Sequence, residues 1–317
     1  MATIEKRWIS GFWRRIAALV ADSIALGVVG FVLGQLFESV FVEMGSWGRL
    51  VGFAISLAYF GLMNSAIYNG QTIGKRLLKI RVVDDSNSTI SLGRSLIRYV
   101  ILGTPFFLNA LQFTGETLPA FAIYPIYIVV FGGIMSILYL YLFNTVSRQS
   151  LHDLLVGTYV VNADQPKQEL GPLWKGHSTI IGLLLLIAAA IPFVSGNLNE
   201  KEVFKNVVSN DQLQLASQAL MDNPVVNAAS VNAAGFTSLD ENGVARRSTF
   251  ISSSLLLREN NVGDEALAKK LAKVVLTTYP DAKDNDLIMM VMSYGYDIGI
   301  FASWSHRQYS FHPEDLQ

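Results

Sequence analysis

A membrane fold is indicated first by residues 11–35, GFWRRIAALVADSIALGVVGFVLGQ. This segment predicts a membrane helix with a carboxylate inside it. A helix needs about 20 mainly apolar residues to cross a bilayer. Asp22 follows Arg15 by two helical turns, so at about 1.5 Å per residue it lies about 10 Å further along the same face. A charge at that depth costs about 2.5 to 3.5 kcal/mol on insertion scales. We therefore expect Asp22 to face other helices and to be paired, protonated or hydrated.

The composition indicates several such helices. Of the 317 residues, 51% are hydrophobic and 15% are charged, and the mean hydropathy is +0.37, which is more apolar than one soluble domain normally is. Five apolar runs occur, at 16–37, 50–67, 99–113, 119–143 and 178–195. The third run contains Pro105, so it is either a kinked span or a re-entrant segment. The residues after 196 have the composition of a soluble domain.

The charges between the runs predict how the chain crosses the bilayer. Lysines and arginines flank the first run and fill the loop between the second and third runs, whereas the loops near 38–48 and 114–118 carry glutamates. Cytoplasmic loops of membrane proteins are enriched in lysine and arginine. Five crossings would then place the N-terminus in the cytoplasm and residues 197–317 outside it. If the run 99–113 does not cross, residues 197–317 lie inside instead.

Several kinds of chemistry are not indicated. The chain has no cysteine, which excludes disulfides, thiolate nucleophiles and cysteine-based zinc sites. Gly74 and Lys75 lack the glycine-rich lead and the following Ser or Thr of a phosphate-binding loop. His152 and Asp153 are adjacent on one turn, which is a poor arrangement for a metal site. We expect no catalytic residues and no enzyme activity, no metal, no cofactor and no nucleic-acid partner.

Two segments between the runs look like partners of each other. NGQTIGKRLLKIRVVD, residues 69–84, and RQSLHDLLVGTYVV, residues 148–161, both begin with polar residues and end in β-branched ones. We expect two short paired strands on the cytoplasmic face, formed by residues 80–83 and 158–161. A turn of interfacial helix is expected before each strand, with leucines that enter the bilayer surface: Leu77, Leu78, Leu154 and Leu155.

These segments together resemble the RDD family of integral membrane proteins, named for one arginine and two aspartates. RRIAALVAD provides Arg15 and Asp22, GQTIGKRLLKIRVVD is similar to the family's glycine-lysine loop, and RQSLHDLLVGT provides the second aspartate, Asp153. The resemblance covers residues 11 to about 162. It implies a four-helix membrane domain in a bacterial cytoplasmic membrane. It also implies transport of an unidentified ligand, or cation/proton exchange.

The family motif supplies the candidate ion or ligand site, which consists of Arg15, Asp22 and Asp153. Gly74, Lys75 and His152 are supporting residues. Two interpretations of Asp22 remain open: it is a titrating group of the site, or it is a structural brace that pairs with Arg15, Arg98 or another basic side chain. Arg15 is also expected to bridge to Asp153 if the first helix packs near that segment.

The C-terminal segment reads as a small two-layer α+β domain with elements in the order α-β-β-α-β-β. Asn242-Gly243 predicts a hairpin between strands at 229–240 and 244–257, and two further strands are expected to turn near Gly295. The sheet is expected to be antiparallel. His306, His312 and Asp297 are more simply explained as solvated sheet residues than as ligands.

The predicted organisation is a multi-pass membrane domain at 1–165, a linker and fifth transmembrane helix at 166–196, and an extracytoplasmic domain at 197–317. The main hypothesis is a transporter, or an exchanger of cations for protons through Asp22. The alternative is a membrane-anchored scaffold or sensor whose charges only brace the helices. The expected partners are the lipid bilayer, further copies of the chain and another envelope protein.

Overall fold

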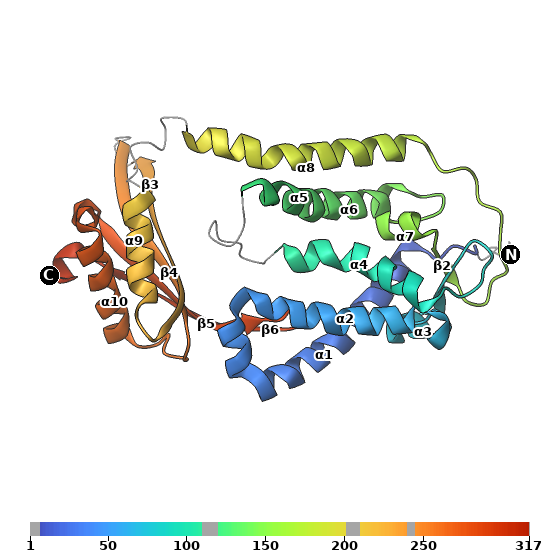
Figure 1. Cartoon of the computed structure of the whole chain (residues 1–317), viewed down its shortest axis with the longest axis horizontal. Helices are drawn as coiled ribbons and strands as arrows, with labels where there is room; N and C mark the ends of the chain where they lie inside the picture. Colours follow the sequence, from blue (N-terminus) through green and yellow to red (C-terminus); the bar gives the residue numbers. More distant parts are fainter. Residues whose placement is uncertain (1–6, 110–119, 201–209, 240–244, 317) are drawn as a thin grey trace. The chain divides into compact units, whose positions relative to one another are not determined.

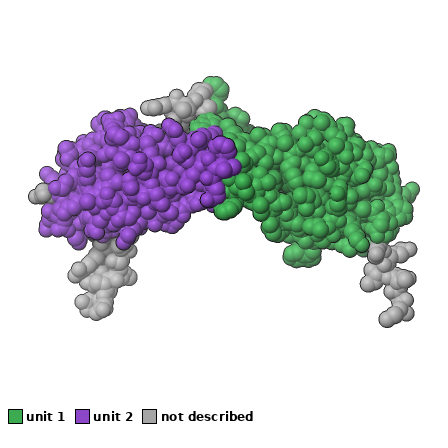
Figure 2. Space-filling model, turned by 90° about the horizontal axis from the view of Figure 1, so that it is seen from below, with its two compact units in different colours: residues 1–34, 46–197, 298–301 green, residues 35–45, 198–297, 302–317 purple. Residues whose placement is uncertain are grey.

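The computed structural model describes residues 7–109, 120–200, 210–239 and 245–316. The chain forms two compact units (Figure 2). Unit 1 comprises residues 1–34, 46–197 and 298–301, and unit 2 comprises residues 35–45, 198–297 and 302–317. The domain boundaries expected from the sequence stay predictions.

Unit 1 is built mainly of apolar helices (Figure 1). They are α1 (Phe12–Met44), α2 (Arg49–Met63), α4 (Leu92–Leu108), α5 (Ile123–Tyr127), α6 (Gly133–Phe143) and α8 (Gly176–Glu200), of which α1 and α8 extend into unit 2. The π-helical turn η4 (Ile128–Gly132) joins α5 to α6, and short 3-10 turns occur at Gly45–Gly48, Ala66–Tyr68 and Ala120–Ala122. Helix α4 packs against α2 and α6. Several apolar helices thus form the N-terminal part of the chain, as expected of a membrane domain.

Three stretches of the described residues are long and apolar enough to cross a membrane, namely Phe12–Met63, Ile123–Phe143 and Gly176–Val194. The first of these contains α1, α2 and the turn between them, and α1 is kinked at Phe37. Helix α4 is not among these stretches; it has 17 residues and contains Pro105. The crossing of the run 99–113, the topology and the four-helix arrangement with a fifth span therefore stay predictions.

Two short strands lie at the end of unit 1 where α4 begins (Figure 1). Strand β1 (Ile80–Val83) pairs with β2 (Tyr159–Asn162) in an antiparallel register that places Val82 opposite Val160. The short helices α3 (Ile73–Leu77) and α7 (Leu151–Val156) precede them. The predicted pairing is therefore confirmed. The β-branched residues fit it because they pack well on a half-buried pleated surface.

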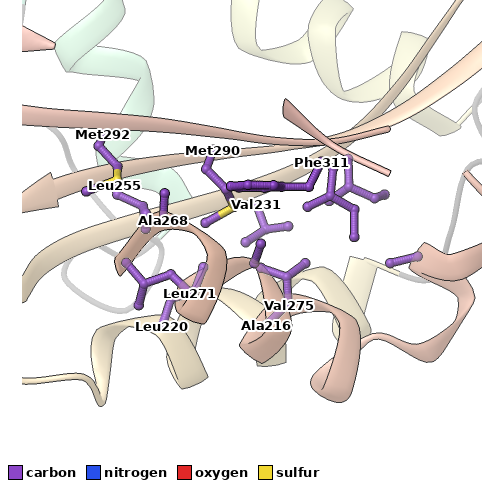
Figure 3. Packing of buried hydrophobic residues seen from close by; sticks show 14 of the residues in the cluster. Ala216, Leu220, Val231, Leu255, Ala268, Leu271, Val275, Met290, Met292 and Phe311 are labelled. Atoms are coloured by element: carbon purple, nitrogen blue, oxygen red, sulfur yellow. The ribbon is translucent and has the colours of Figure 1, made fainter. Parts of the chain in front are cut away.

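Unit 2 is a four-stranded sheet covered by helices. Its elements are α9 (Asn210–Met221), β3 (Val226–Leu239), β4 (Ala245–Leu257), α10 (Glu265–Thr278), β5 (Leu287–Asp297) and β6 (Ala302–Phe311), with 3-10 turns at Pro280–Asp284 and Pro313–Leu316. The strand order is β3-β4-β5-β6. Figure 3 shows Met290 and Val231 of the sheet pointing toward Leu271 and Val275 of α10. These four side chains belong to one hydrophobic core.

Two details of this sheet differ from the predictions. The sheet is mixed, since β4 and β5 are parallel; α10 connects them, and a helical crossover returns the chain in the same direction. Gly295 does not mark a turn but lies inside β5 opposite Trp304. The chain turns after Asp297, where Gly299 has a φ of +78°, a conformation that glycine adopts without steric cost. The predicted Asn242-Gly243 hairpin lies outside the described residues.

Candidate functional site

Asp22 is buried in unit 1 and holds the first turn of α3. Its carboxylate oxygens accept hydrogen bonds from the Tyr59 hydroxyl at 2.7 Å, the Thr72 hydroxyl at 2.6 Å and the Gly74 amide at 2.7 Å. The side chain is 1% exposed, as expected for a carboxylate that faces protein instead of lipid. All three donors are neutral, and among the described residues Asp22 forms no ion pair with Arg15 or Arg98. The partners of Asp22 thus differ from the two arginines that the sequence suggested, and whether Asp22 is a titrating group or a structural brace stays a prediction.

The amide groups at the start of α3 are all satisfied. The Ile73 amide donates to the Tyr59 hydroxyl at 3.1 Å, the Gly74 amide donates to Asp22, and the Lys75 amide donates to the Thr72 hydroxyl at 3.2 Å. The first amides of a helix have no partner within the helix, and a helix N-terminus favours negative charge. Asp22 therefore anchors α3 against α1.

Gly74 permits this close approach. A Cβ atom at this position would collide with the carbonyl oxygen of Ala18 on α1 and would lie 3.0 Å from Asp22 Oδ1. Ala18 is itself 1% exposed. A larger residue would therefore push α3 away from the carboxylate that caps it. The close contact with Ala18 therefore explains why position 74 is a glycine.

Asp153 is the centre of a second, charged network. Its Oδ2 atom is 2.9 Å from Arg15 Nη2, and its Oδ1 atom is 2.8 Å from Arg98 Nη2. The Thr158 hydroxyl donates to Oδ1 at 2.9 Å, and Arg15 also donates to the carbonyl oxygen of Arg148. Asp153 is fully buried. The expected bridge between Arg15 and Asp153 is present, with Arg98 as a second cation.

Burial and the neighbouring charges shift the pKa values of both Asp153 and His152. Burial raises the pKa of Asp153, but the Arg98 and Arg15 guanidinium groups outweigh it and hold that pKa well below its usual range. Burial lowers the pKa of His152 to about 3, despite the attraction of Asp153, so its imidazole is neutral near pH 7. Its Nδ1 atom has no hydrogen-bond partner among the described residues.

Lys75 brings a further cation to the same region from α3. Its Nζ atom is 3.4 Å from the Thr72 hydroxyl and 5.7 Å from the centre of the Phe60 ring. Burial, and then repulsion from Arg98, lower the pKa of Lys75 to about 7, although Asp22 and Asp153 partly oppose this shift. No ion pair joins Lys75 to a carboxylate in the part of the chain that the structure describes.

These side chains border a cavity of about 460 Å³ within unit 1. Its lining includes the acidic and basic side chains of Arg15, Asp22, Lys75, Arg98 and His152. The lining becomes apolar further along the same helices, with Leu26 on α1 and Leu102 and Phe106 on α4. The cavity therefore changes from charged to apolar along its length. Its volume lies in the range of small-molecule sites, about 300 to 1,000 Å³.

The structure places all six residues predicted for the site in one region. Asp22, Gly74 and Lys75 meet around α3, and Arg15, His152 and Asp153 meet around α7. Sequence reasoning missed Tyr59 and Thr72 as partners of Asp22, and it missed Thr158. The sequence signal that could have indicated these partners is that each is a polar residue in or beside an apolar run. Whether the region binds an ion or ligand stays a prediction, and the described residues contain no cluster of three metal-binding side chains.

Comparison with known proteins agrees with a membrane domain of this kind. Residues 9–157 match the model of the RDD family. The N-terminal half of the chain is therefore similar to the RDD family. The match ends before α8 and the C-terminal sheet, so it covers the buried charges and most of the cavity lining.

Two curated relatives share this half. Uncharacterized protein YckC of Bacillus subtilis (strain 168) is 26% identical over 168 residues, which are 51% of this chain and 89% of the relative. Uncharacterized protein YxaI of the same organism is 27% identical over 124 residues, which are 32% of this chain and 82% of the relative. No solved structure matches the chain.

Proposed function

We propose that this RDD family membrane protein binds an anionic solute in the cavity of unit 1, as the binding step of transport. The observation that carries the proposal is the charge of the cavity wall. Arg15, Lys75 and Arg98 contribute three cations, whereas the nearby carboxylates are those of Asp22 and Asp153. Asp153 already pairs with both arginines. A bound anion would give the partly buried Lys75 amine a charged partner.

The same geometry argues for a structural role of Asp22. Its two oxygens accept three hydrogen bonds from neutral groups that belong to α2 and the start of α3. A cation that bound there would have to displace these donors and would also meet Lys75. Exchange of cations for protons through Asp22 is therefore the less favoured form of transport. Asp22 instead holds α3, and through it Lys75, at the cavity.

The orientation of the chain belongs to the same proposal. With the N-terminus in the cytoplasm, the charged part of the cavity lies toward the cytoplasmic side, and residues 197–317 lie outside the cytoplasm. The basic residues around α3 and the start of α4 favour this orientation. A cytoplasmic signal from a reporter fused to the C-terminus would contradict it.

The binding proposal is tested with the purified full-length protein. We expect at least one of acetate, inorganic phosphate and decanoate to raise the midpoint of thermal unfolding, because a ligand that binds the native state stabilises it. Lys75→Gln should abolish the shift. Arg76→Gln is the matched control, since Arg76 is an exposed neighbour on α3 whose loss removes the same charge. The proposal is wrong if no anion gives a shift that depends on Lys75.

A scaffold or sensor is the second candidate function. Unit 2 has its own hydrophobic core, which includes Leu255, Leu271 and Met290, and its sheet lies beyond the RDD match. A tethered domain of this kind is suited to contact another envelope protein, and the buried charges of unit 1 would then be braces. Reproducible recovery of one envelope protein with the full chain, together with no anion binding, would favour this candidate.

A further inference from the structure

We propose that the anionic solute is an amphiphile with a single acyl chain, which reaches the cavity from the bilayer. Its carboxylate or phosphate group would contact Lys75 and Arg98, and its chain would lie along the apolar part of the cavity. This inference rests on the proposed function and narrows the class of solute.

The first observation is the order of residues along two helices. On α4 the cavity lining runs from Arg98 to Leu102 and then to Phe106 and Phe107, a distance of about 14 Å at about 1.5 Å per residue. On α1 it runs from Arg15 to Leu26. A small hydrophilic anion would satisfy the cations but leave this apolar length empty. An acyl chain would fill this apolar length.

The second observation concerns the rim of the cavity. Leu19 of α1 and Leu138 of α6 both line the cavity, yet their side chains are 48% and 45% exposed. The rim between these helices is therefore apolar. In a membrane-spanning helix, such exposed leucines face hydrocarbon, which dissolves an acyl chain but excludes a small free anion. Access through this rim suits a molecule that already resides in the bilayer.

The third observation is the size of the cavity. Its volume of about 460 Å³ lies in the lower half of the range of small-molecule sites, about 300 to 1,000 Å³. This space suits one chain of medium length with a compact head group better than the two long chains of an ordinary phospholipid, so we commit to a single-chain occupant.

The experiment compares three matched probes on the full-length protein: decanoate, which has both head group and chain; decanol, which lacks the charge; and acetate, which lacks the chain. Bound probe is counted by native mass spectrometry, and the affinity is followed by the shift in thermal unfolding. We expect one decanoate per chain, with an affinity at least tenfold higher than that of either other probe.

Variants test both parts of the cavity. Lys75→Gln should weaken decanoate binding at least tenfold and leave decanol unchanged. Leu102→Trp should weaken both, because it fills the apolar part of the cavity. Leu138→Trp at the rim is a second variant, since a half-exposed position tolerates the larger ring if Leu102→Trp does not fold. Leu77→Trp is the control, because Leu77 is 69% exposed and does not line the cavity.

The outcomes separate this inference from the function on which it rests. Equal affinities for acetate and decanoate, both dependent on Lys75, would overturn the amphiphile and leave the anion site. Equal affinities for decanol and decanoate would overturn the charged head group. Decanoate binding that responds to Leu77→Trp as strongly as to Leu102→Trp and Leu138→Trp would show surface partitioning and would overturn the inference.

Discussion

Asp22 and Asp153 are both buried carboxylates of the RDD motif, but their surroundings differ. Asp153 contacts two guanidinium groups, from Arg15 and Arg98, whereas Asp22 accepts hydrogen bonds only from neutral donors. One carboxylate therefore balances charge, and the other caps a short helix. Two acids of one sequence motif therefore have different physical roles.

The largest effect is expected for Asp153→Asn. This change would leave two buried guanidinium groups without their carboxylate, and breaking a buried ion pair in this way costs about 3 to 5 kcal/mol. The amide group would also point toward one of the arginines. We expect a large fall in folded yield and in the midpoint of thermal unfolding in detergent. A variant as stable as the wild type would contradict the charge-balancing role.

A charge exchange sharpens this prediction. Arg15→Asp combined with Asp153→Arg restores the pair between these two positions, but it places the new arginine beside Arg98. We therefore expect no rescue of folding by the double variant. Full rescue, measured by the same folded yield and unfolding midpoint, would mean that Arg98 does not need Asp153 as its ion-pair partner.

Asp22→Asn should have a smaller effect than Asp153→Asn. Asparagine keeps one oxygen for the Tyr59 hydroxyl and the Gly74 amide, and its NH₂ group can donate to the Thr72 hydroxyl. The expected loss is about 1 to 3 kcal/mol, typical of a disturbed buried hydrogen bond. The test is the order of the two unfolding midpoints. If Asp22→Asn lowers the unfolding midpoint more than Asp153→Asn does, the roles assigned to the two carboxylates are wrong.

Gly74→Ala tests the contact between α3 and α1. The added methyl group would collide with the carbonyl oxygen of Ala18, and overpacking of this kind costs about 1 to 3 kcal/mol. Gly93→Ala is the matched control on α4, because a Cβ atom there meets nothing within 4 Å. We expect the control to be neutral or slightly stabilising. Equal unfolding midpoints for the two variants would show that α3 does not approach α1 closely at Gly74.

The smallest effect is expected for Lys75→Met, and it appears in the dependence on pH. The pKa of Lys75 is lowered from 10.5 to about 7 in the folded state. The unfolded chain therefore binds more protons between pH 7 and 10.5, and stability should rise with pH across this range. The charged groups that act on the amine are Arg15, Asp22, Arg98 and Asp153.

Replacement of Lys75 by methionine should remove this pH-dependent contribution to stability. Lys75→Met should be at least as stable as the wild type at pH 7, because it no longer buries a cation, and its unfolding midpoint should rise less between pH 7 and 9. The measurement is thermal unfolding of both proteins over this interval. Identical pH profiles would show that Lys75 does not titrate there.

The sequence predicted the local features of this protein better than the distant ones. The β-branched residues at 80–83 and near 159–162 were sufficient to predict a pair of strands, which the structure confirms. The bridge from Arg15 to Asp153 followed from the family motif. The role of Asp22 could not be predicted, because Tyr59 and Thr72 lie far along the chain and nothing in their spacing shows that they meet one carboxylate.

In unit 2, too, the sequence predicted local features better than contacts between distant segments. The strong helix now described as α10 was recognised, but the sequence does not reveal on which side of the sheet the next strand returns, so the parallel pairing of β4 and β5 was missed. Gly295 looked like a turn because glycine is common in turns. Its backbone is instead accommodated within β5, where a Cβ atom would collide with the carbonyl oxygen of Ser303.

If a bound anion contacts the Lys75 amine, binding should be accompanied by proton uptake. Decanesulfonate is a suitable probe because its own charge does not titrate near neutral pH. Calorimetry at pH 8 in buffers of different ionisation enthalpy should detect proton uptake by the wild type, because the anion favours the protonated amine, and none by Lys75→Gln. Binding without proton uptake, or uptake that persists in Lys75→Gln, would contradict the claim.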